Sequence, residues 1–526
     1  MEKWGAAGEK GVLLVEIGTG SGGGTREMVV ILLGRGWRFS EFFCIFAILM
    51  KARQVLIFFA GVFAMMGMLW LAVPADGVPV GPVTVRFASY QRTLQEAAEQ
   101  KVDVDSVLTG VANRFRMQDD TLQFYRRFFY ENPDRIYLPG NDYRFFDDVF
   151  KEMEMAGRQN RTVRVVHYGD SQIELDRISQ DLREALQGRF GGQGTGLFPA
   201  LSNVPSASIS KSANGAFTQY TMYGDSTTVR AGHNRYGMLA QVVQLTGGGT
   251  ISLRGSKNKN AREGVKTFSS VSLLYGRASQ GFDVKVVSDT LKPAPVRTVG
   301  ESGATLLTWT FPRPVEKATL RILGNAEIYA VGADGSSGVA VDNIPLRGCS
   351  GTIFHRISKP LMTDCFALTD TRLIILQFGG NYMPVARNTK VIEQYQEQIA
   401  REIQYFHEVA PQAKILFIGP SDMGKSVNGR IVTWPNLPTL VDSLRSTALS
   451  NDAAYWDLFR MMGGENSMVQ WVKHRPAYAG PDYIHFTSEG ARKVGDALSQ
   501  SILTCYNFYE LRKTYPARKV EEAMHP

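Results

Sequence analysis

Three side chains have the types and settings of a nucleophilic catalyst, and the first is a serine that lies far from the other two in the sequence. Ser171 follows the β-branched run TVRVVHY (162–168) in the tripeptide Gly169-Asp170-Ser171, and a helical pattern over about 172–189 comes next. A turn between strand and helix places a hydroxyl at the carboxyl edge of a sheet, where a helix N-terminus favours developing negative charge. The pattern therefore predicts a nucleophile at Ser171.

The other two side chains lie near the carboxyl terminus. Asp482 and His485 stand three residues apart in the segment DYIHFT. This spacing lets the carboxylate hold one ring nitrogen, fix the imidazole tautomer and leave the other nitrogen facing the serine. The structural alternatives are Ser171 as a helix N-cap and His485 as an ordinary loop histidine. Asp170 is interpreted as a hydrogen-bonding residue of its turn.

The elements that must position these side chains alternate between strand and helix. Apolar runs at 372–378, 414–419 and 454–459 precede helical patterns at 387–408, 437–449 and 488–503. Continuous apolar strands that alternate with helices predict a parallel sheet covered on both faces. We therefore expect an α/β fold in three layers, α/β/α.

Two other segments have different patterns. Residues 205–338 contain short strands separated by Gly, Ser, Asn and Pro, which predicts a β-sandwich inserted into the α/β domain. Stabilising the host and binding a ligand are equally open roles for it. Residues 90–160 place apolar residues three and four apart and predict a helical lead-in. The α/β domain then comprises 161–204 and 339–510.

At this point the residues resemble the SGNH hydrolases, also called GDSL esterases, whose Ser, Gly, Asn and His stand in separate blocks in this order. The blocks are HYGDSQ with Ser171, DNIPLRGCSG with Gly348, QFGGN with Asn381, and DYIHFT with Asp482 and His485. The resemblance implies a catalytic set of Ser171, Asp482 and His485. It also implies an oxyanion hole made by Ser171, Gly348 and Asn381.

The sequence departs from the family pattern at two positions. Tyr382 stands where the family commonly has an acid, and Gln172 stands where the family name has Leu. Neither change removes a group that the mechanism needs, but both weaken an inference about lipid substrates. Gly351 is the alternative to Gly348 for the glycine of the oxyanion hole.

The order of the segments is similar to that in peptidoglycan O-acetylesterases, in which the insert resembles a carbohydrate-binding module. This similarity implies an esterase that removes O-acetyl groups from an envelope glycan such as peptidoglycan. An O-acetyltransferase that uses the same residues is one alternative. A catalytically silent glycan-binding protein is another.

A membrane segment is expected before the α/β domain. Residues 55–73 (VLIFFAGVFAMMGMLWLAV) carry no charge and would span about 28 Å as a helix. Lys51 and Arg53 precede them, which predicts a cytoplasmic segment 1–54 and a catalytic domain on the periplasmic side of the inner membrane. A cleaved signal peptide is the alternative. Met50 is the expected translation start.

The composition argues against a nucleic-acid-binding protein and against a metalloprotein. The chain of 526 residues has 44% hydrophobic residues and a net charge of +8 without a long basic run, so nucleic acid is not an expected partner. Four cysteines show no CxxC pair and no histidine at ligand spacing, and the other histidines, His167 among them, show no metal pattern. We therefore expect no metal and no cofactor, and the sequence indicates no protein partner.

Overall fold

The computed structural model describes residues 10–16, 28–34, 57, 59–65, 68, 78–80, 83–85, 121–201, 204–224, 228–258, 261–300 and 303–524. The chain divides into two compact units, 1–101 and 102–526. The first unit contains two antiparallel strand pairs. The pairs are β1 (Lys10–Glu16) with β2 (Met28–Gly34), and β3 (Val78–Val80) with β4 (Val83–Val85). The central sheet, the helices from α5 (Thr121–Tyr130) onward and the inserted β segment belong to the second unit.

The predicted membrane segment, 55–73, lies largely outside the described residues. Those that are described there, 57, 59–65 and 68, are helical. Within the described part of the chain, no helix has both the length and the apolar character needed to cross a bilayer.

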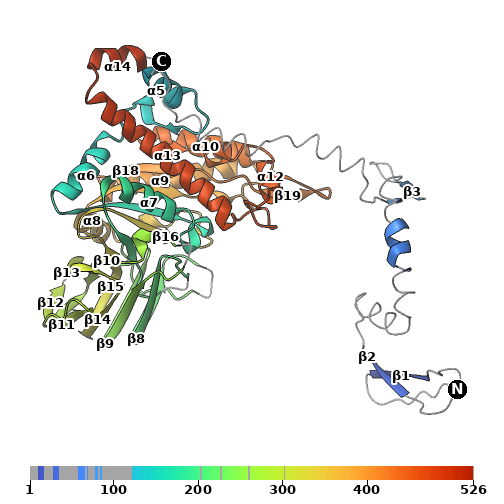
Figure 1. The fold of residues 1–526 in the computed structure, drawn as a ribbon, viewed down its shortest axis with the longest axis horizontal. Coiled ribbons are helices and arrows are strands. Elements are labelled where there is room, and N and C mark those ends of the chain that lie inside the picture. The colour runs from blue at the N-terminus through green and yellow to red at the C-terminus, as the bar shows by residue number, and fades with distance from the viewer. Residues whose placement is uncertain are drawn as a thin grey trace. The chain divides into compact units, whose positions relative to one another are not determined.

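A six-stranded sheet forms the centre of the second unit, in the order β16-β6-β17-β18-β21-β5 (Figure 1). The first five strands are parallel, and β5 pairs antiparallel with β21 at the edge. The predicted α/β class with a parallel sheet is therefore confirmed. The strands are β5 (Ile136–Tyr137), β6 (Thr162–Gly169), β16 (Gly338–Pro345), β17 (Thr371–Gln377), β18 (Lys414–Ile418) and β21 (Ala454–Trp456).

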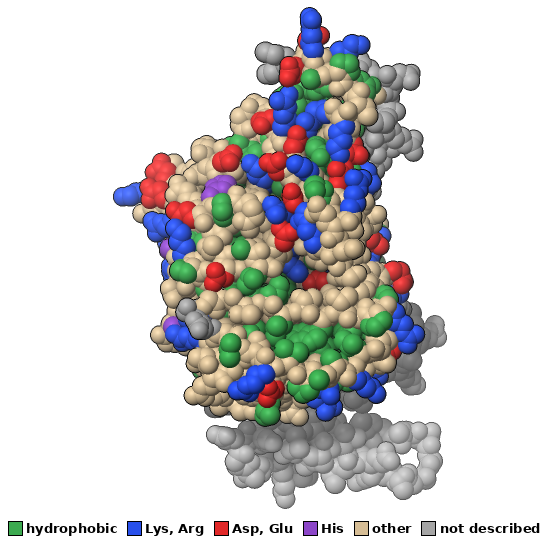
Figure 2. Space-filling model, turned by 90° about the vertical axis from the view of Figure 1, so that its left-hand side faces the viewer, with side chains coloured by type: hydrophobic (Ala, Val, Ile, Leu, Met, Phe, Trp, Pro, Cys, Tyr) green, Lys and Arg blue, Asp and Glu red, His purple; other side chains and the backbone are tan. Residues whose placement is uncertain are grey.

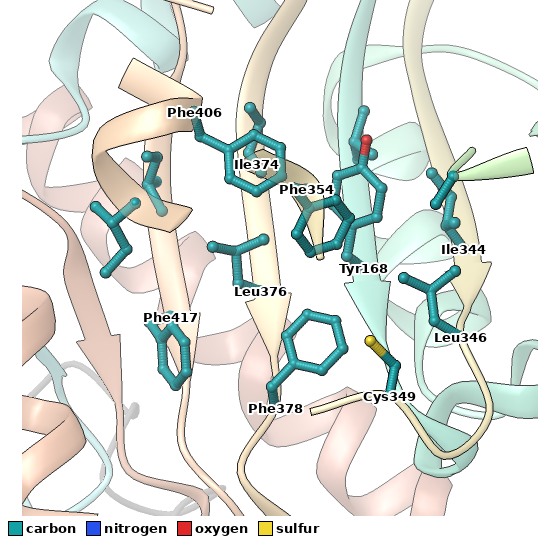
Figure 3. Packing of buried hydrophobic residues seen from close by; sticks show 14 of the residues in the cluster. Tyr168, Ile344, Leu346, Cys349, Phe354, Ile374, Leu376, Phe378, Phe406 and Phe417 are labelled. Atoms are coloured by element: carbon teal, nitrogen blue, oxygen red, sulfur yellow. The ribbon is translucent and has the colours of Figure 1, made fainter. Parts of the chain in front are cut away.

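Alternate side chains of the central strands enter two separate cores, because successive residues of a strand point to opposite faces. Val163 and Val165 of β6 join one core, while Val166 and Tyr168 join the other. Helices cover both faces, and Figure 3 shows the second core, where Tyr168 packs beside Phe354. The helices of the first core are α5 (Thr121–Tyr130), α6 (Asp147–Arg158), α7 (Ser179–Phe190), α11 (Leu458–Met461), α12 (Ser467–Lys473), α13 (Ser488–Arg512) and α14 (Ala517–Met524). Those of the second are α8 (Lys359–Leu368), α9 (Thr389–Val409) and α10 (Leu437–Ser450).

The predicted helical lead-in is described only from residue 121. Its helices α5 and α6 are present, but the segment also contributes β5, which the sequence pattern did not indicate. Short elements complete this unit: the 3-10 turns η1 (Pro139–Asn141), η2 (Ser171–Asp176), η3 (Glu263–Val265), η4 (Phe354–Arg356) and η5 (Gly380–Tyr382), and the hairpin β19 (Gly424–Val427) with β20 (Arg430–Thr433).

The insert is a nine-stranded antiparallel sheet around one core, not two separate sheets. Its strands stay continuous because β9 pairs with β14 along 248–254 and with β15 along 243–245. β7, which precedes the predicted insert, also belongs to this sheet. The strands are β7 (Gly194–Phe198), β8 (Ile209–Thr221), β9 (Gln241–Gly255), β10 (Phe268–Gly276), β11 (Ala278–Val287), β12 (Val296–Gly300), β13 (Thr305–Val315), β14 (Lys317–Gly324) and β15 (Ala326–Asp334).

Charged side chains on one face of this protein are mixed in sign. Figure 2 shows Lys and Arg interspersed with Asp and Glu over the upper part of one face. Mixed signs of this kind give no extended field of one charge on that face.

A buried arginine joins the insert to the central sheet. Arg164 of β6 donates to Asp342 of β16 at 2.5 Å and to Asp334 of β15 at 2.9 Å. The Leu197 backbone N–H of β7 donates to the same Asp342 oxygen at 2.7 Å. All three charged side chains are nearly inaccessible to solvent. The orientation of the insert on the sheet is therefore fixed by charge as well as by packing.

We expect Arg164→Met to lower the free energy of unfolding by about 3–5 kcal/mol, because it leaves two buried carboxylates without their cation. Guanidinium-induced unfolding measures the change. Arg297→Ala is the matched control, since the ion pair of Arg297 with Asp283 is exposed and its loss should cost less than about 1 kcal/mol. Equal effects of the two substitutions would contradict the structural role of Arg164.

Candidate active site

A cavity of about 170 Å³ opens at the carboxyl edge of the central sheet. Its walls come from the segments that follow three neighbouring parallel strands, β6, β17 and β18, and from the loop before α13. Carboxyl edges of parallel sheets are the usual place for ligand sites in α/β proteins. Residues from these segments that line the cavity include Asp170, Ser171, Gln172, Phe378, Asn381, Met423, Ile484 and His485.

The structure brings the predicted serine, histidine and aspartate into one hydrogen-bonded chain. Ser171 Oγ lies 2.8 Å from His485 Nε2, and His485 Nδ1 lies 2.7 Å from Asp482 Oδ2. Because a carboxylate only accepts, Nδ1 carries the proton in the neutral ring, and Nε2 is left to accept the Ser171 hydroxyl proton. This is the arrangement that activates a serine for nucleophilic attack.

Asp482 is held by three donors. Its Oδ1 accepts the backbone N–H groups of Ile484 and His485, both at 3.1 Å, while Oδ2 faces the imidazole. Burial alone would raise the pKa of Asp482, but these hydrogen bonds outweigh it and leave the pKa below its usual value. The carboxylate is therefore charged at neutral pH and stabilises an imidazolium.

The loop that carries the imidazole has an unusual backbone. Tyr483, between Asp482 and Ile484, has a φ of 57°, a conformation that costs energy for a residue with a side chain. Its N–H donates to the Gly480 carbonyl at 3.0 Å, and its carbonyl accepts from Gly424 at 2.8 Å. The hairpin β19–β20 thus supports the strained residue from outside the loop.

The turn after β6 differs from the sequence prediction. Ser171 does not begin a long helix: it begins η2, and α7 starts only at Ser179. Leu175 and Asp176, the last two residues of η2, have φ of 59° and 64° and end it before α7 begins. The predicted effect of a helix N-terminus on Ser171 is therefore wrong, because two left-handed residues interrupt the helix path.

Two side chains of the turn, Gln172 and Arg177, fasten it to the imidazole loop, and we call this pair the loop clamp. The Gln172 amide donates to the Ile484 carbonyl at 2.7 Å and accepts from the Phe486 N–H at 3.3 Å. The Arg177 guanidinium donates to the carbonyls of Ser171 and Phe486, at 2.7 and 3.0 Å. Both contacts bracket His485. From the sequence, Gln172 was noted only as a departure from the family pattern, and Arg177 was not predicted to have a role.

Asn381 enters the cavity wall from η5. Its amide donates to Asp170 Oδ2 at 2.8 Å and lies 3.3 Å from the Cys349 carbonyl. Asp170 Oδ1 accepts from the Gln172 N–H at 2.9 Å, so Asp170 has the turn-stabilising role that the sequence indicated. Burial raises the pKa of Asp170 to about 6 despite these bonds.

Two predicted site residues do not line the cavity: Asp482, which contacts it through His485, and Gly348. Of the described residues that line the cavity, none is Gly348 or Gly351. Gly348 does precede the Cys349 carbonyl that Asn381 contacts, and its φ of 74° is one that glycine adopts readily. Its part in an oxyanion hole stays a prediction.

The Gly-Gly-Asn turn needs its first glycine. Gly379 has a φ of 126°, and a side-chain carbon there would lie 3.0 Å from Pro420.

Tyr382, at the family's acid position, stacks on Tyr395 with ring centroids 4.0 Å apart. Phe378 packs in the core beneath the cavity, near Cys349 (Figure 3). The replacement of the acid by Tyr382 therefore serves packing.

His167 supports the turn from inside the sheet, a role that its sequence context did not predict. Its Nδ1 lies 2.9 Å from Ser179 Oγ, which donates to Asn343 at 2.8 Å, and Asn343 donates to the Ile173 carbonyl at 3.1 Å. On the other side of the ring, His167 Nε2 lies 3.1 Å from Gln377 Oε1. Burial lowers the pKa of His167 to about 4, so the ring is neutral.

The comparisons agree with this architecture. No family model matches the chain, and no curated protein matches its sequence. Among solved structures, the chain is similar to a peptidoglycan O-acetylesterase at 20% identity, with 71% of this chain and 99% of that chain covered and a TM-score of 0.57. The chain therefore has the fold of the SGNH hydrolases.

Two further solved structures match with lower scores. An acetyl xylan esterase is 15% identical over 31% of this chain and 81% of that chain, with a TM-score of 0.25. A family two carbohydrate esterase from Cellvibrio japonicus is 9% identical over 57% of this chain and 99% of that chain, with a TM-score of 0.23.

We expect Arg177→Ala to slow covalent labelling of Ser171 by a fluorophosphonate probe about 10- to 100-fold, because His485 loses an anchor and small displacements in a site are costly. Time courses of labelling measure the rate, and Ser171→Ala sets the background. Arg492→Ala, which removes an exposed arginine of α13 beside Glu489, should label at the wild-type rate. Unchanged labelling of Arg177→Ala would show that the loop clamp does not position the imidazole.

Proposed function

We propose that the protein is a serine esterase that removes O-acetyl groups from an envelope glycan, with peptidoglycan as the favoured polymer. The observation that carries the proposal is the continuous hydrogen-bonded chain from Ser171 through His485 to Asp482. It is supported by the shared fold with the peptidoglycan O-acetylesterase. The glycan, the acetyl group and the location in the envelope are parts of the proposal.

The reaction begins with attack of Ser171 Oγ on the ester carbonyl while His485 Nε2 takes the hydroxyl proton. Collapse of the tetrahedral intermediate breaks the bond to the sugar oxygen, and the imidazolium returns the proton to the leaving alcohol. Water, deprotonated by the same imidazole, then attacks the acyl-serine and releases acetate. The Asp482 carboxylate stabilises the imidazolium in both steps.

The oxyanion of the intermediate needs donors at the cavity wall. Asn381 offers its amide there, and its longer contact, to the Cys349 carbonyl, is the one that a substrate oxygen would replace. The backbone N–H groups of Ser171 and Gly348 are the other proposed donors. Each aligned donor is worth about 3–4 kcal/mol in transition-state stabilisation.

The size of the cavity favours a short acyl group. A volume of about 170 Å³ accommodates an acetyl group next to Ser171 but not an extended fatty-acyl chain. Phe378 and Met423 are among the apolar residues that line it. This agrees with the expectation that lipids are not the substrate.

Transfer of the acetyl group to another sugar hydroxyl is the second candidate function, since the same residues form the same acyl-serine. Exposure of His485, at 40% of its side chain, gives water access to the base and favours hydrolysis. Purified protein given an acetyl donor and a glycan acceptor tests this point. Transfer in excess of hydrolysis would support the transferase.

We expect Ser171→Ala and His485→Ala to reduce acetate release from O-acetylated peptidoglycan by about 10⁴-fold or more, because each removes a group that acts in the chemical step. Asp482→Asn should cost a similar or smaller factor through loss of the tautomer. Enzymatic determination of released acetate gives the rates, and Arg492→Ala serves as the control. Retained activity of Ser171→Ala would exclude the acyl-serine, and a wild-type protein that neither labels nor releases acetate would favour a silent glycan-binding protein.

Tethering of the catalytic unit to the outer face of the inner membrane through residues 55–73 is also part of the proposal. Its support is the uncharged stretch of 19 residues after Lys51 and Arg53. We expect the full chain to stay in the membrane fraction after an alkaline carbonate wash, and Val62→Arg with Phe63→Arg to release it. Recovery of the unaltered chain in the soluble fraction would contradict the anchor, and a shortened mature chain would indicate a cleaved signal.

A further inference from the structure

A second cavity, of about 50 Å³, lies where the insert meets the back of the catalytic turn. We call it the junction pocket. Its walls come from β7, β8, β9 and β16 and from the end of η2, and exposed residues of the 204–206 segment stand at its rim. It shares no lining residue with the cavity at Ser171.

Two polar groups of the junction pocket point to a ligand. The Thr195 hydroxyl is buried, with 6% of the residue exposed, and has no hydrogen-bond partner. The Lys211 ammonium donates to the Pro199 carbonyl and lies 5.3 Å from the centre of the Phe198 ring. An ammonium has three N–H groups, so the Pro199 bond leaves donor capacity in the pocket that the unpartnered hydroxyl also lines.

The charges around the junction pocket leave Lys211 as its uncompensated cation. Asp176 also lines the pocket, but its two carboxylate oxygens accept from both terminal nitrogens of Arg183, at 2.5 and 3.1 Å. Tyr223 is the remaining titratable residue of the lining, and burial raises its pKa to about 12, so it is neutral. Lys211 is half-buried, and a half-buried cation with spare donors and no carboxylate of its own is complementary to an anion.

We propose that the junction pocket binds a carboxylate, with Lys211 supplying the charge and Thr195 a hydrogen bond. The volume suits a single carboxyl group with a methyl-sized substituent. The carboxyl can come from free acetate or from an acidic sugar of a glycan chain that reaches the rim. That acetate is also the reaction product rests on the proposed function, but the binding of a carboxylate does not.

Binding should depend on pH through Lys211. Burial lowers the pKa of Lys211 to about 7, so the free site is mostly protonated at pH 6.0 and mostly neutral at pH 8.5. The bound carboxylate favours the ammonium and raises its pKa, so binding near pH 7.5 takes up a proton. Affinity for a carboxylate therefore falls as pH rises, by roughly 10- to 30-fold between pH 6.0 and 8.5.

Isothermal titration calorimetry of Ser171→Ala protein with sodium acetate tests the proposal without turnover. We expect saturable binding at pH 6.0 that weakens at pH 8.5, is lost in Ser171→Ala with Lys211→Met, and is about 10-fold weaker with Thr195→Val, whose side chain has the same shape. Lys425→Met, which removes an exposed lysine of β19, is the matched control and should bind as the parent does. Thermal melting establishes that each variant is folded. If Lys211→Met does not fold, Thr195→Val alone still tests the proposal.

The results separate the possibilities. Acetate binding unaffected by both Lys211→Met and Thr195→Val, or no binding to the parent at 50-fold the concentration of protein and at pH 6.0, would overturn the proposal. Galacturonate in place of acetate distinguishes the sources: tighter binding of the sugar acid identifies a glycan carboxyl, and binding of acetate alone identifies the free anion. Because the Ser171→Ala protein is inactive in either case, these results do not depend on the esterase reaction.

Discussion

The loop clamp is the interaction on which the candidate site depends. Ser171 and His485 are 314 residues apart in the sequence, and short contacts between the turn and the imidazole loop hold them together. Gln172 and Arg177 supply these contacts through backbone carbonyls and one N–H group, so they fix the path of the chain on both sides of His485. The 2.8 Å contact between the Ser171 and His485 side chains keeps its geometry because the backbones on both sides are held in this way.

The parts predicted from sequence are those that local chemistry determines. The β-branched run before Gly169 predicted its strand, and the spacing of three between Asp482 and His485 predicted their contact. The alternation of strands and helices predicted the parallel sheet. The helix start was predicted about seven residues early, at about 172 instead of Ser179, because the left-handed backbone at Leu175 and Asp176 has no glycine or asparagine to signal it. Arg177 was missed because its partners are carbonyls, which any sequence provides.

The insert shows the same division. Short strands and turn residues predicted a β-rich segment, but the continuity of its sheet depends on β9 having different partners along its 15 residues. The strand β7 and the edge strand β16 were not predicted, since their pairing partners lie far away in the sequence. The role of Arg164 could not be inferred for the same reason: Asp334 and Asp342 are 170 and 178 residues away. Contacts of this kind become visible only in three dimensions.

The place of the insert in the chain also constrains the order of synthesis. β6 ends at Gly169, while its two neighbours in the sheet begin at Gly338 and Thr371. On the ribosome, all nine strands of the insert are therefore made before the serine strand has either neighbour available. The sheet around Ser171 can therefore form only after the strands of the insert have been made. Nascent chains that stall between residues 169 and 338 should expose the unpaired edges of β6 to chaperones.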